Sequence, residues 1–296
     1  MDLLSKYGYA PDKEAIDRSL DLIAKNLDNV VSTDVLKECM SMMDLTSLHT
    51  TDTAASIERL AEKINAFQTE YPGYPGPASV CVFANLVPAL RKSLIAPGVH
   101  ITGVAGSFPT AQSFLEVKVK ECELAVEGGA DEIDVVLALN AFFAGEYERA
   151  AEEIRAIRQA LDNLAVKVGR KIILKVIVES GLLVTPERIA EASFLAMEAG
   201  ADFIKTSTGK VEVNATPMAA YVMCECVKAF CQKTGRKVGF KAAGGISSAM
   251  DAVCYYSIVS TVLGKEWLNK GLFRFGVSRL ANNLMSAIEQ KTVAYF

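Results

Sequence analysis

The 296-residue sequence lacks several features that would define its class at once. It has no uninterrupted apolar run of about 18 residues, the length that a membrane-spanning helix needs. The N-terminal segment turns acidic soon after Met1 and lacks a basic stretch followed by an apolar core, so it does not resemble a signal peptide. An excess of one charge is also missing, since 31 basic and 35 acidic residues give a net charge of −4. We therefore expect a protein that binds neither membranes nor nucleic acid.

Histidines and paired cysteines are scarce as well. The two histidines, His49 and His100, do not form an H-E-x-x-H motif, so no metal site is expected. The seven cysteines include no C-x-x-C pair, and their odd number at low density is typical of reduced thiols in the cytoplasm. Cys81 lies in an apolar run, where its expected role is packing.

What the sequence does contain is a repeated structural period. Eight apolar, β-rich runs occur at residues 40–46, 78–83, 99–104, 131–137, 171–178, 201–206, 237–242 and 272–275. Helical patterns separate them, and the later runs start about 30–40 residues apart, which is the size of a βα unit. This alternation predicts an α/β fold, a (β/α)8 TIM barrel, with a doubly wound open sheet as the alternative.

Helix boundaries and chain length support a single barrel. Thr185 and Thr216 are predicted N-caps, because each precedes a proline at the first helical position. A barrel takes about 250 residues, so the remainder is assigned to an N-terminal helical extension over residues 1–38. Residues 39–296 are then one barrel domain with a short C-terminal tail.

Charged residues interrupt four of the apolar strands. They are Asp134, Lys175, Lys205 and Lys241. Such residues are almost never buried unless they are paired, and inward positions near the carboxyl ends of barrel strands form active sites. Neighbouring ammonium groups lower one another's pKa, and a neutral amine forms a Schiff base with a carbonyl, while a nearby aspartate can shuttle protons. A buried Lys–Asp pair with a purely structural role is the alternative.

Glycines follow the last three strands. The relevant positions are Gly209 and Lys210 after the sixth strand, Gly244 and Gly245 after the seventh, and Gly276 and Ser278 after the eighth. Glycine lets backbone N–H groups approach phosphate oxygens, and barrel phosphate sites are built from these last loops. The pattern predicts a phosphate site, although the glycines could also serve only to make turns.

Several motifs together resemble the deoxyribose-phosphate aldolases, which are class I aldolases with a (β/α)8 barrel. The Phe203-Ile-Lys-Thr-Ser-Thr-Gly-Lys210 segment is similar to their Schiff-base segment. Further matches, in the same order as in that family, are Met43-Asp-Leu-Thr46, Ala130-Asp-Glu-Ile-Asp-Val-Val136, Leu174-Lys-Val-Ile-Val-Glu179, Val238-Gly-Phe-Lys-Ala-Ala-Gly-Gly245 and Arg274-Phe-Gly-Val-Ser278. The resemblance covers residues 39–282.

The resemblance implies reversible cleavage of 2-deoxy-D-ribose 5-phosphate to D-glyceraldehyde 3-phosphate and acetaldehyde, a step of deoxyribonucleotide catabolism in the cytoplasm. Lys205 would form the imine, so no cofactor is implied. Lys241 would lower the pKa of Lys205 and relay protons with Asp134. Substrate-binding residues implied by the resemblance are Asp44, Thr46, Lys175, Gly209, Lys210, Gly244, Gly245, Gly276 and Ser278. Tyr295, near the C-terminus, would assist proton transfer, and a homodimer is one expected assembly.

The sequence departs from the family pattern at three positions near the expected phosphate site. Ala242 stands where proline is frequent, Ser247 where arginine is frequent, and Arg279 where a second serine is common. Two other functions stay open at this point. The chain could be a non-catalytic barrel paralogue that acts as a binding or scaffold protein, or a transaldolase-like class I aldolase.

Overall fold

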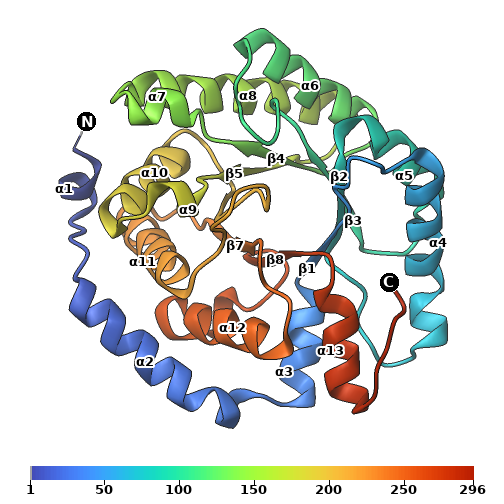
Figure 1. Ribbon diagram of the computed structural model, residues 1–296. Helices are drawn as coiled ribbons and strands as arrows, with labels where there is room; N and C mark the ends of the chain where they lie inside the picture. Colours follow the sequence, from blue (N-terminus) through green and yellow to red (C-terminus); the bar gives the residue numbers. More distant parts are fainter. Residues whose placement is uncertain (1) are drawn as a thin grey trace.

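Eight parallel strands pair in sequence order and close into a barrel in the computed structural model, which describes residues 2–296 (Figure 1). The strands are β1 (Met43–Thr46), β2 (Ser79–Phe83), β3 (His100–Val104), β4 (Glu132–Val136), β5 (Ile173–Ile177), β6 (Phe203–Lys205), β7 (Gly239–Ala243) and β8 (Phe273–Val277). The predicted TIM barrel is confirmed, and the open-sheet alternative is wrong because β1 pairs with β8.

Helices surround the barrel and connect its strands (Figure 1). Before β1 come α1 (Leu3–Tyr7), α2 (Lys13–Val30) and α3 (Thr33–Ser41). The first half of the barrel carries α4 (Ala54–Glu70), η1 (Ala84–Leu86), α5 (Val87–Ser93), α6 (Leu115–Glu127), α7 (Leu139–Phe143) and α8 (Tyr147–Val168). The second half carries α9 (Ser180–Leu183), α10 (Pro186–Glu198), α11 (Pro217–Thr234), α12 (Ala249–Leu263), η2 (Lys265–Trp267) and α13 (Leu280–Glu289).

The helix signals in the sequence act as expected at α10 and α11. The Thr185 and Thr216 side chains each accept a hydrogen bond from a backbone N–H of the first turn, and a proline occupies the first helical position of each helix. Gly235 ends α11 in a left-handed conformation, with φ of 72°.

The first strand is shorter than the sequence predicts. The apolar run 40–46 begins inside α3, whose N-terminus is capped by the Ser32 side chain and whose buried face includes Cys39 and Met40. Met40 is apolar because it covers the core from a helix, and periodicity alone does not distinguish such a position from one in a strand. The strand itself begins at Met43.

The helices that precede the barrel pack on its outer ring. In Figure 1, α1 and α2 run along the outside of α10, α11 and α12. The Tyr7 ring stacks on Phe194 of α10 with 4.4 Å between centroids, and the Tyr9 hydroxyl donates a 2.8 Å hydrogen bond to Glu225 of α11. The N-terminal helices therefore share a core with the second half of the barrel.

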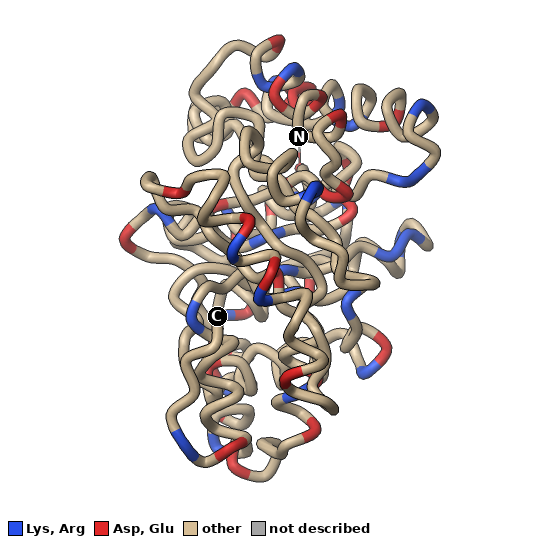
Figure 2. Tube along the Cα trace, turned by 90° about the vertical axis from the view of Figure 1, so that its right-hand side faces the viewer, with Lys and Arg blue, Asp and Glu red and all other residues tan. Residues whose placement is uncertain are grey.

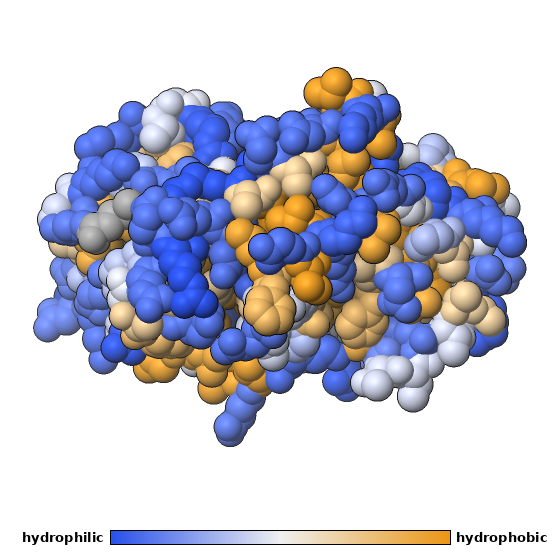
Figure 3. All heavy atoms as spheres, turned by 90° about the horizontal axis from the view of Figure 1, so that it is seen from above, coloured by the Kyte–Doolittle hydropathy of each residue, from blue (hydrophilic) through white to orange (hydrophobic). Residues whose placement is uncertain are grey.

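The outer surface carries no concentration of one charge. Figure 2 shows basic and acidic residues interspersed over the outer helices. The face seen from above is mostly hydrophilic, and apolar atoms emerge in groups between polar side chains (Figure 3). Exposed apolar residues on and beside α6 are Phe114, Val117 and Leu124. Within residues 2–296, no helix combines the length and the apolar character that crossing a membrane requires.

Alternation along the strands places the charged residues inside the barrel. Outward residues such as Ile204 and Val176 are fully buried against the helices, while their neighbours face the interior. The register pairs Asp134 with Lys175 and pairs Lys205 with Lys241. Parallel pairing thus brings polar side chains from four consecutive strands to similar heights in the barrel.

Gly239 has a packing role in this interior. A Cβ at this position would overlap the Phe203 ring, which fills the barrel beneath Lys205. We therefore predict that Gly239→Ala lowers the free energy of unfolding by about 1–3 kcal/mol, because an overpacked core must distort. Urea unfolding measures this loss.

Gly76→Ala is the matched control for this substitution. A Cβ at Gly76 would meet its nearest neighbours at 3.7 and 3.9 Å, which is ordinary van der Waals contact. A Gly239→Ala variant as stable as Gly76→Ala would contradict the packing role assigned to Gly239.

Candidate active site

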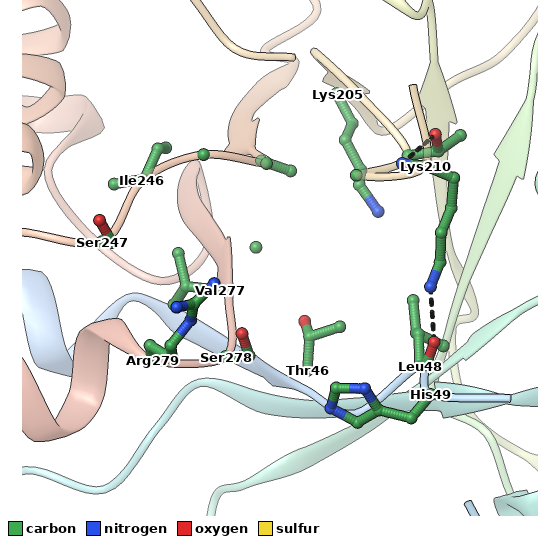
Figure 4. A pocket seen from close by; sticks show the side chains of 16 residues that line it. Thr46, Leu48, His49, Lys205, Lys210, Ile246, Ser247, Val277, Ser278 and Arg279 are labelled. Atoms are coloured by element: carbon green, nitrogen blue, oxygen red, sulfur yellow. Dashed lines mark hydrogen bonds between the residues drawn. The ribbon is translucent and has the colours of Figure 1, made fainter. Parts of the chain in front are cut away.

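A cavity of about 350 Å³ opens at the carboxyl ends of β1, β6, β7 and β8. The residues that line it are Thr46, Leu48, His49, Lys205, Thr208, Gly209, Lys210, Ala243, Gly244, Gly245, Ile246, Ser247, Gly276, Val277, Ser278 and Arg279. The Lys205 side chain points into the cavity, opposite Ser278 and Arg279 (Figure 4). This is the end of a (β/α)8 barrel at which active sites occur.

Lys205 sits above a buried carboxylate that several cations share. Its Nζ donates a 2.8 Å hydrogen bond to Oδ2 of Asp134, and the Lys241 Nζ donates to the same oxygen, also at 2.8 Å. The Lys175 Nζ donates to the other oxygen, Oδ1, at 2.8 Å. Three lysine side-chain nitrogens therefore converge on Asp134, and all four side chains are at most 4% exposed.

The three lysines differ in their basicity. Burial lowers the pKa of Lys205, and the Lys241 ammonium lowers it further, although Asp134 acts in the opposite direction. Burial also opposes charge on Lys241, but Asp134 and Asp44 outweigh it and raise the pKa of that lysine. In the same way, Asp134 and Glu132 raise the pKa of Lys175 against its burial. Lys205 is thus the member of this trio that loses its proton most easily.

Asp134 itself stays ionised. Burial favours the neutral carboxyl, but Lys175, Lys205 and Lys241 together hold the pKa of Asp134 well below its usual range. A carboxylate beside Lys205 and Lys241 can stabilise positive charge on either nitrogen.

Asp44 and Lys175, which the resemblance places at the substrate, lie below the cavity instead. Neither lines it, and both are fully buried. The Asp44 Oδ2 lies 2.5 Å from the Lys241 Nζ, and its Oδ1 lies 2.5 Å from Nη1 of Arg274. Both residues are committed to buried ion pairs, whereas Thr46, two residues beyond Asp44, does reach the cavity.

The polar end of the cavity is built mainly from backbone. The six predicted glycine, lysine and serine positions all line it; Gly276 lies within β8, and the other five follow β6, β7 or β8. Gly244 has φ of 84°, and a Cβ there would lie 2.7 Å from the Asn214 side chain, so only glycine fits. The Lys210 Nζ donates a 2.6 Å hydrogen bond to the Leu48 carbonyl across the cavity (Figure 4).

The loop that follows Lys205 is held by a buried glutamate. Glu179 accepts hydrogen bonds from the Thr208 backbone N–H at 3.1 Å and from the Thr208 hydroxyl at 2.5 Å. Burial raises the pKa of Glu179 against these hydrogen bonds. The contact fixes the chain between Lys205 and the glycine-lined end of the cavity.

Two residues named as candidates from the sequence lie outside the cavity lining. Cys81 packs with Leu48 and Val104 in a small apolar cluster, and burial raises the pKa of its thiol. Tyr295 lies on the outer side of the barrel, where its hydroxyl donates to the Lys63 carbonyl at 2.8 Å and its ring packs on Phe67. The C-terminal segment is held there by packing and hydrogen bonds rather than at the cavity.

Sequence reasoning missed part of the site. Arg279 and Ser247 line the cavity, although the sequence flagged them only as departures from a family pattern. Glu132 and Arg274 are buried below Lys205. Their signal was present, because each is a charged residue within an apolar strand, two positions from another inward residue.

These features define a (β/α)8-barrel enzyme whose active-site cavity lies at the carboxyl ends of its strands. Sequence comparison gives the family. The model of DeoC/LacD family aldolases matches residues 39–254. The human deoxyribose-phosphate aldolase is 40% identical over 260 residues, which are 84% of this chain and 79% of the human protein. The bovine deoxyribose-phosphate aldolase is 40% identical over 256 residues, 83% of this chain and 78% of its own.

Solved structures agree with the sequence relatives. The deoxyribose phosphate aldolase of Aeropyrum pernix superposes with a TM-score of 0.66 at 25% identity, covering 90% of this chain and 96% of that one. The aldolase QR15 gives a TM-score of 0.68 at 27% identity, with 85% and 96% covered. The chain belongs to the DeoC/LacD family of aldolases, and it is an aldolase, a carbon–carbon lyase.

The buried ion pairs predict acid sensitivity. Burial opposes the charge of Asp44, but Arg274, Lys241 and Lys175 lower its pKa to about 2, from 3.8 for a free aspartate. This carboxylate therefore stabilises the fold fully above the unfolded pKa, and that stability is lost as the pH falls toward the folded pKa. We predict that Asp44 alone lowers the free energy of unfolding by about 1.5 kcal/mol between pH 5 and pH 2.5.

Urea unfolding at the two pH values measures this drop. Glu132 and Asp134 also have lowered pKa values, so they add to the loss in the same direction. A free energy of unfolding that stays constant over this pH range would contradict the charged state assigned to the buried carboxylates.

Proposed function

We propose that the protein is a class I deoxyribose-phosphate aldolase that reversibly cleaves 2-deoxy-D-ribose 5-phosphate to D-glyceraldehyde 3-phosphate and acetaldehyde. The observation that carries this proposal is that one cavity holds both a buried reactive amine and a glycine-lined region suited to a phosphate. Lys205, the buried amine with a lowered pKa, points into the cavity, Arg279 lies across the cavity from it, and glycines and Lys210 line the remaining walls. An aldehyde at the amine and a phosphate at the glycine-lined region describe a small sugar phosphate. The human relative, named for this activity, supports the choice.

The reaction begins at Lys205. Its neutral amine attacks the C1 aldehyde of the open-chain sugar, and uptake of one proton from the Lys241–Asp134 relay with loss of water leaves a protonated imine. The 3-hydroxyl then returns a proton to this relay, the C2–C3 bond breaks, its electron pair moves into the imine to form an enamine, and glyceraldehyde 3-phosphate leaves. Protonation of the resulting enamine and addition of water release acetaldehyde and restore Lys205. The imine serves as the electron sink, so the reaction uses no organic cofactor.

Asp134 and Lys241 provide the electrostatics of this sequence. The carboxylate 2.8 Å from the Lys205 Nζ is placed to stabilise the positive imine nitrogen, which forms where the ammonium would otherwise sit. The Lys241 ammonium, on the same carboxylate oxygen, lowers the pKa of Lys205 and is a proton donor within the buried network. We assign proton relay to this pair.

The phosphate end uses backbone and two cations. Gly209, Gly244, Gly245 and Gly276 let N–H groups approach the phosphate oxygens, and Ser278 precedes Arg279, the N-cap residue of α13. Thr46 is assigned to the sugar, since it lines the cavity beside Ser278, across from Lys205. Lys175 and Asp44 are assigned to the charged layer below the cavity rather than to substrate.

Substrate supply and assembly complete the proposal. A deoxyribose phosphate arises from deoxynucleotide breakdown, so we place the enzyme in cytoplasmic deoxyribonucleotide catabolism. All seven cysteines are free thiols, which is compatible with a reducing compartment. A homodimer stays a prediction, and the A. pernix relative is described as tetrameric.

Lys205 is tested by reductive trapping. We predict that acetaldehyde with borohydride adds a stable two-carbon adduct to Lys205, located by peptide mass spectrometry. Lys205→Met should abolish the adduct and lower kcat/KM for deoxyribose 5-phosphate by at least about 10³-fold, because the nucleophile is gone. Lys210→Met removes a lysine of the same cavity but keeps Lys205, so this control variant should still form the adduct.

The outcomes of this test separate the alternatives. No adduct on the folded wild-type protein, with turnover near background, would instead indicate a binding or scaffold protein. Faster cleavage of ketose phosphates than of deoxyribose 5-phosphate would indicate a transaldolase-like enzyme.

The phosphate end is tested by substrate choice. We predict that Lys210→Met and Arg279→Met each raise KM for deoxyribose 5-phosphate about tenfold or more, since a charged hydrogen bond contributes about 1.5–3 kcal/mol. Cleavage of unphosphorylated 2-deoxyribose should change little in either variant. Equal losses with both substrates would show that these side chains do not bind the phosphate.

A further inference from the structure

A second layer of charges lies beneath Lys205, toward the amino ends of the strands, and the proposed reaction does not use it. Its centre is an ion pair between Glu132 of β4 and Arg274 of β8. The Arg274 Nη2 lies 2.8 Å from Oε1 of Glu132, and its Nη1 lies 3.2 Å from Oε2. Neither side chain is more than 2% exposed, and neither lines the cavity.

This layer is connected to Lys205 by an unbroken series of contacts. Oε2 of Glu132 lies 2.6 Å from the Lys175 Nζ, which in turn donates to Oδ1 of Asp134 at 2.8 Å. Lys205 donates to the other oxygen of the same aspartate. Two carboxylates and one ammonium therefore separate Arg274 from the reacting amine.

The charges of the cluster balance only when Lys205 is neutral. The buried anions are Asp44, Glu132 and Asp134, and the buried cations other than Lys205 are Lys175, Lys241 and Arg274. Three negative and three positive charges cancel, so a proton on Lys205 would add a fourth positive charge. An unbalanced charge costs several kcal/mol in an interior of low dielectric constant, and the amine at the cavity can avoid that cost by losing its proton.

We propose that Glu132 and Arg274 are positioning residues that set the charge of the buried cluster and thereby make Lys205 the one lysine that is neutral in the resting enzyme. The inference rests on the proposed function only for its purpose, since a neutral Lys205 is what imine formation requires. Its electrostatic content can be tested separately. Arg274 itself stays charged in this layer. Burial opposes its charge, but the carboxylates of Asp44 and Glu132 outweigh burial and raise the pKa of Arg274.

Other groups near Lys205 leave this balance in place. The titratable or charged side chains that surround it are Asp44 on β1, Cys81 on β2, Asp134 on β4, Lys175 on β5, Glu179 after β5, Lys210 after β6 and Lys241 on β7. Burial raises the pKa of the Cys81 thiol and of the Glu179 carboxyl, and the hydrogen bonds of Glu179 go to Thr208 rather than to the lysines of the cluster. Lys210 lies at the cavity surface and is exposed to solvent there.

Two substitutions change the charge of the layer in opposite directions. Glu132→Gln removes one negative charge while it keeps nearly the same shape, so Lys205 should release its proton at lower pH. Arg274→Gln removes one positive charge, so Lys205 should hold its proton to higher pH. The double variant restores the balance and should return Lys205 close to its wild-type behaviour.

The readout is the rate at which cyanate carbamylates Lys205 as a function of pH, followed by peptide mass spectrometry. Cyanate reacts with neutral amines, so the rate on the acidic limb of the profile reports the neutral fraction. On the acidic limb, we expect the carbamylation rate to rise at least about tenfold for Glu132→Gln and to fall at least about tenfold for Arg274→Gln. The rate follows the neutral fraction of Lys205, and a tenfold change in its acid dissociation constant changes that fraction tenfold. The double variant should lie within about threefold of the wild type.

Each outcome decides the proposal. Opposite changes in rate that cancel in the double variant support it, because general loosening of the barrel would move both single variants in the same direction. Changes of the same sign, no change, or two changes that do not cancel would overturn it.

His100 provides a test that does not remove a buried charge, in case a single variant fails to fold. Its Nδ1 lies 2.7 Å from Oε1 of Glu132, and its side chain is 44% exposed at the amino end of β3. The charged groups that face it are Glu132 on β4, Arg274 on β8 behind that carboxylate, and Lys270, whose Nζ donates to the Gly98 carbonyl at 3.0 Å. On β2 it is paired with uncharged Ser79.

A permanent positive charge at position 100 should offset part of the negative charge of Glu132, and so favour the neutral form of Lys205. We expect His100→Lys to raise the carbamylation rate of Lys205 about twofold on the acidic limb. His100→Asn, the uncharged control, should leave the rate close to the wild type. Equal rates in these two variants would overturn the proposal. The result is independent of the aldolase activity: if acetaldehyde trapping fails while these changes in rate are seen, the proposed function falls and the charge layer stands.

Discussion

Asp134 carries its negative charge in the middle of the barrel with none of its side chain exposed, and the rest of the site depends on that charge being neutralised. Three lysine side-chain nitrogens surround it, two on one oxygen and one on the other. Removing one partner of such a buried pair costs about 3–5 kcal/mol, so the arrangement is held tightly. The same arrangement gives Lys205 two neighbours with opposite effects. Asp134 favours a positive charge on the imine nitrogen, and Lys241 disfavours a positive charge on the free amine. One carboxylate thus serves both the resting state and the intermediate.

The barrel makes this cluster geometrically simple. Parallel strands in register bring inward residues of neighbouring strands to similar heights, as with Lys205 beside Lys241 and Asp134 beside Lys175. Small residues make room for the long side chains; Gly239, for example, leaves space for the Phe203 ring. The carboxyl ends of the last three strands then supply glycines to the same cavity that receives Lys205. The order of the strands in the barrel therefore places the Lys205 amine and the predicted phosphate site in the same cavity.

Much of this could be predicted from the sequence, because the periodicity of βα units and a charge within an apolar strand are local signals. They identified all eight strands and the residues around Asp134. Two kinds of feature escaped. The start of β1 was misplaced because Met40 is apolar on a helix face, as a residue of a buried strand would be. Glu132 and Arg274 each show the signal of a charge within an apolar strand, but their pairing between strands four and eight is not visible in any sequence spacing, so the lower layer was missed. Likewise, the outer position of Tyr295 follows from packing on Phe67.

The central claim is that the fold holds one lysine neutral and its two neighbours charged. The most direct measurement is an NMR pH titration of the lysine side-chain nitrogens, with Lys205, Lys175 and Lys241 assigned by single Lys→Met variants. The account predicts that Lys205 titrates below the exposed lysines, while Lys175 and Lys241 keep their protons above them, as the directions of their pKa values require. Titration of Lys205 together with the exposed lysines, or loss of the Lys241 proton before that of Lys205, would contradict it.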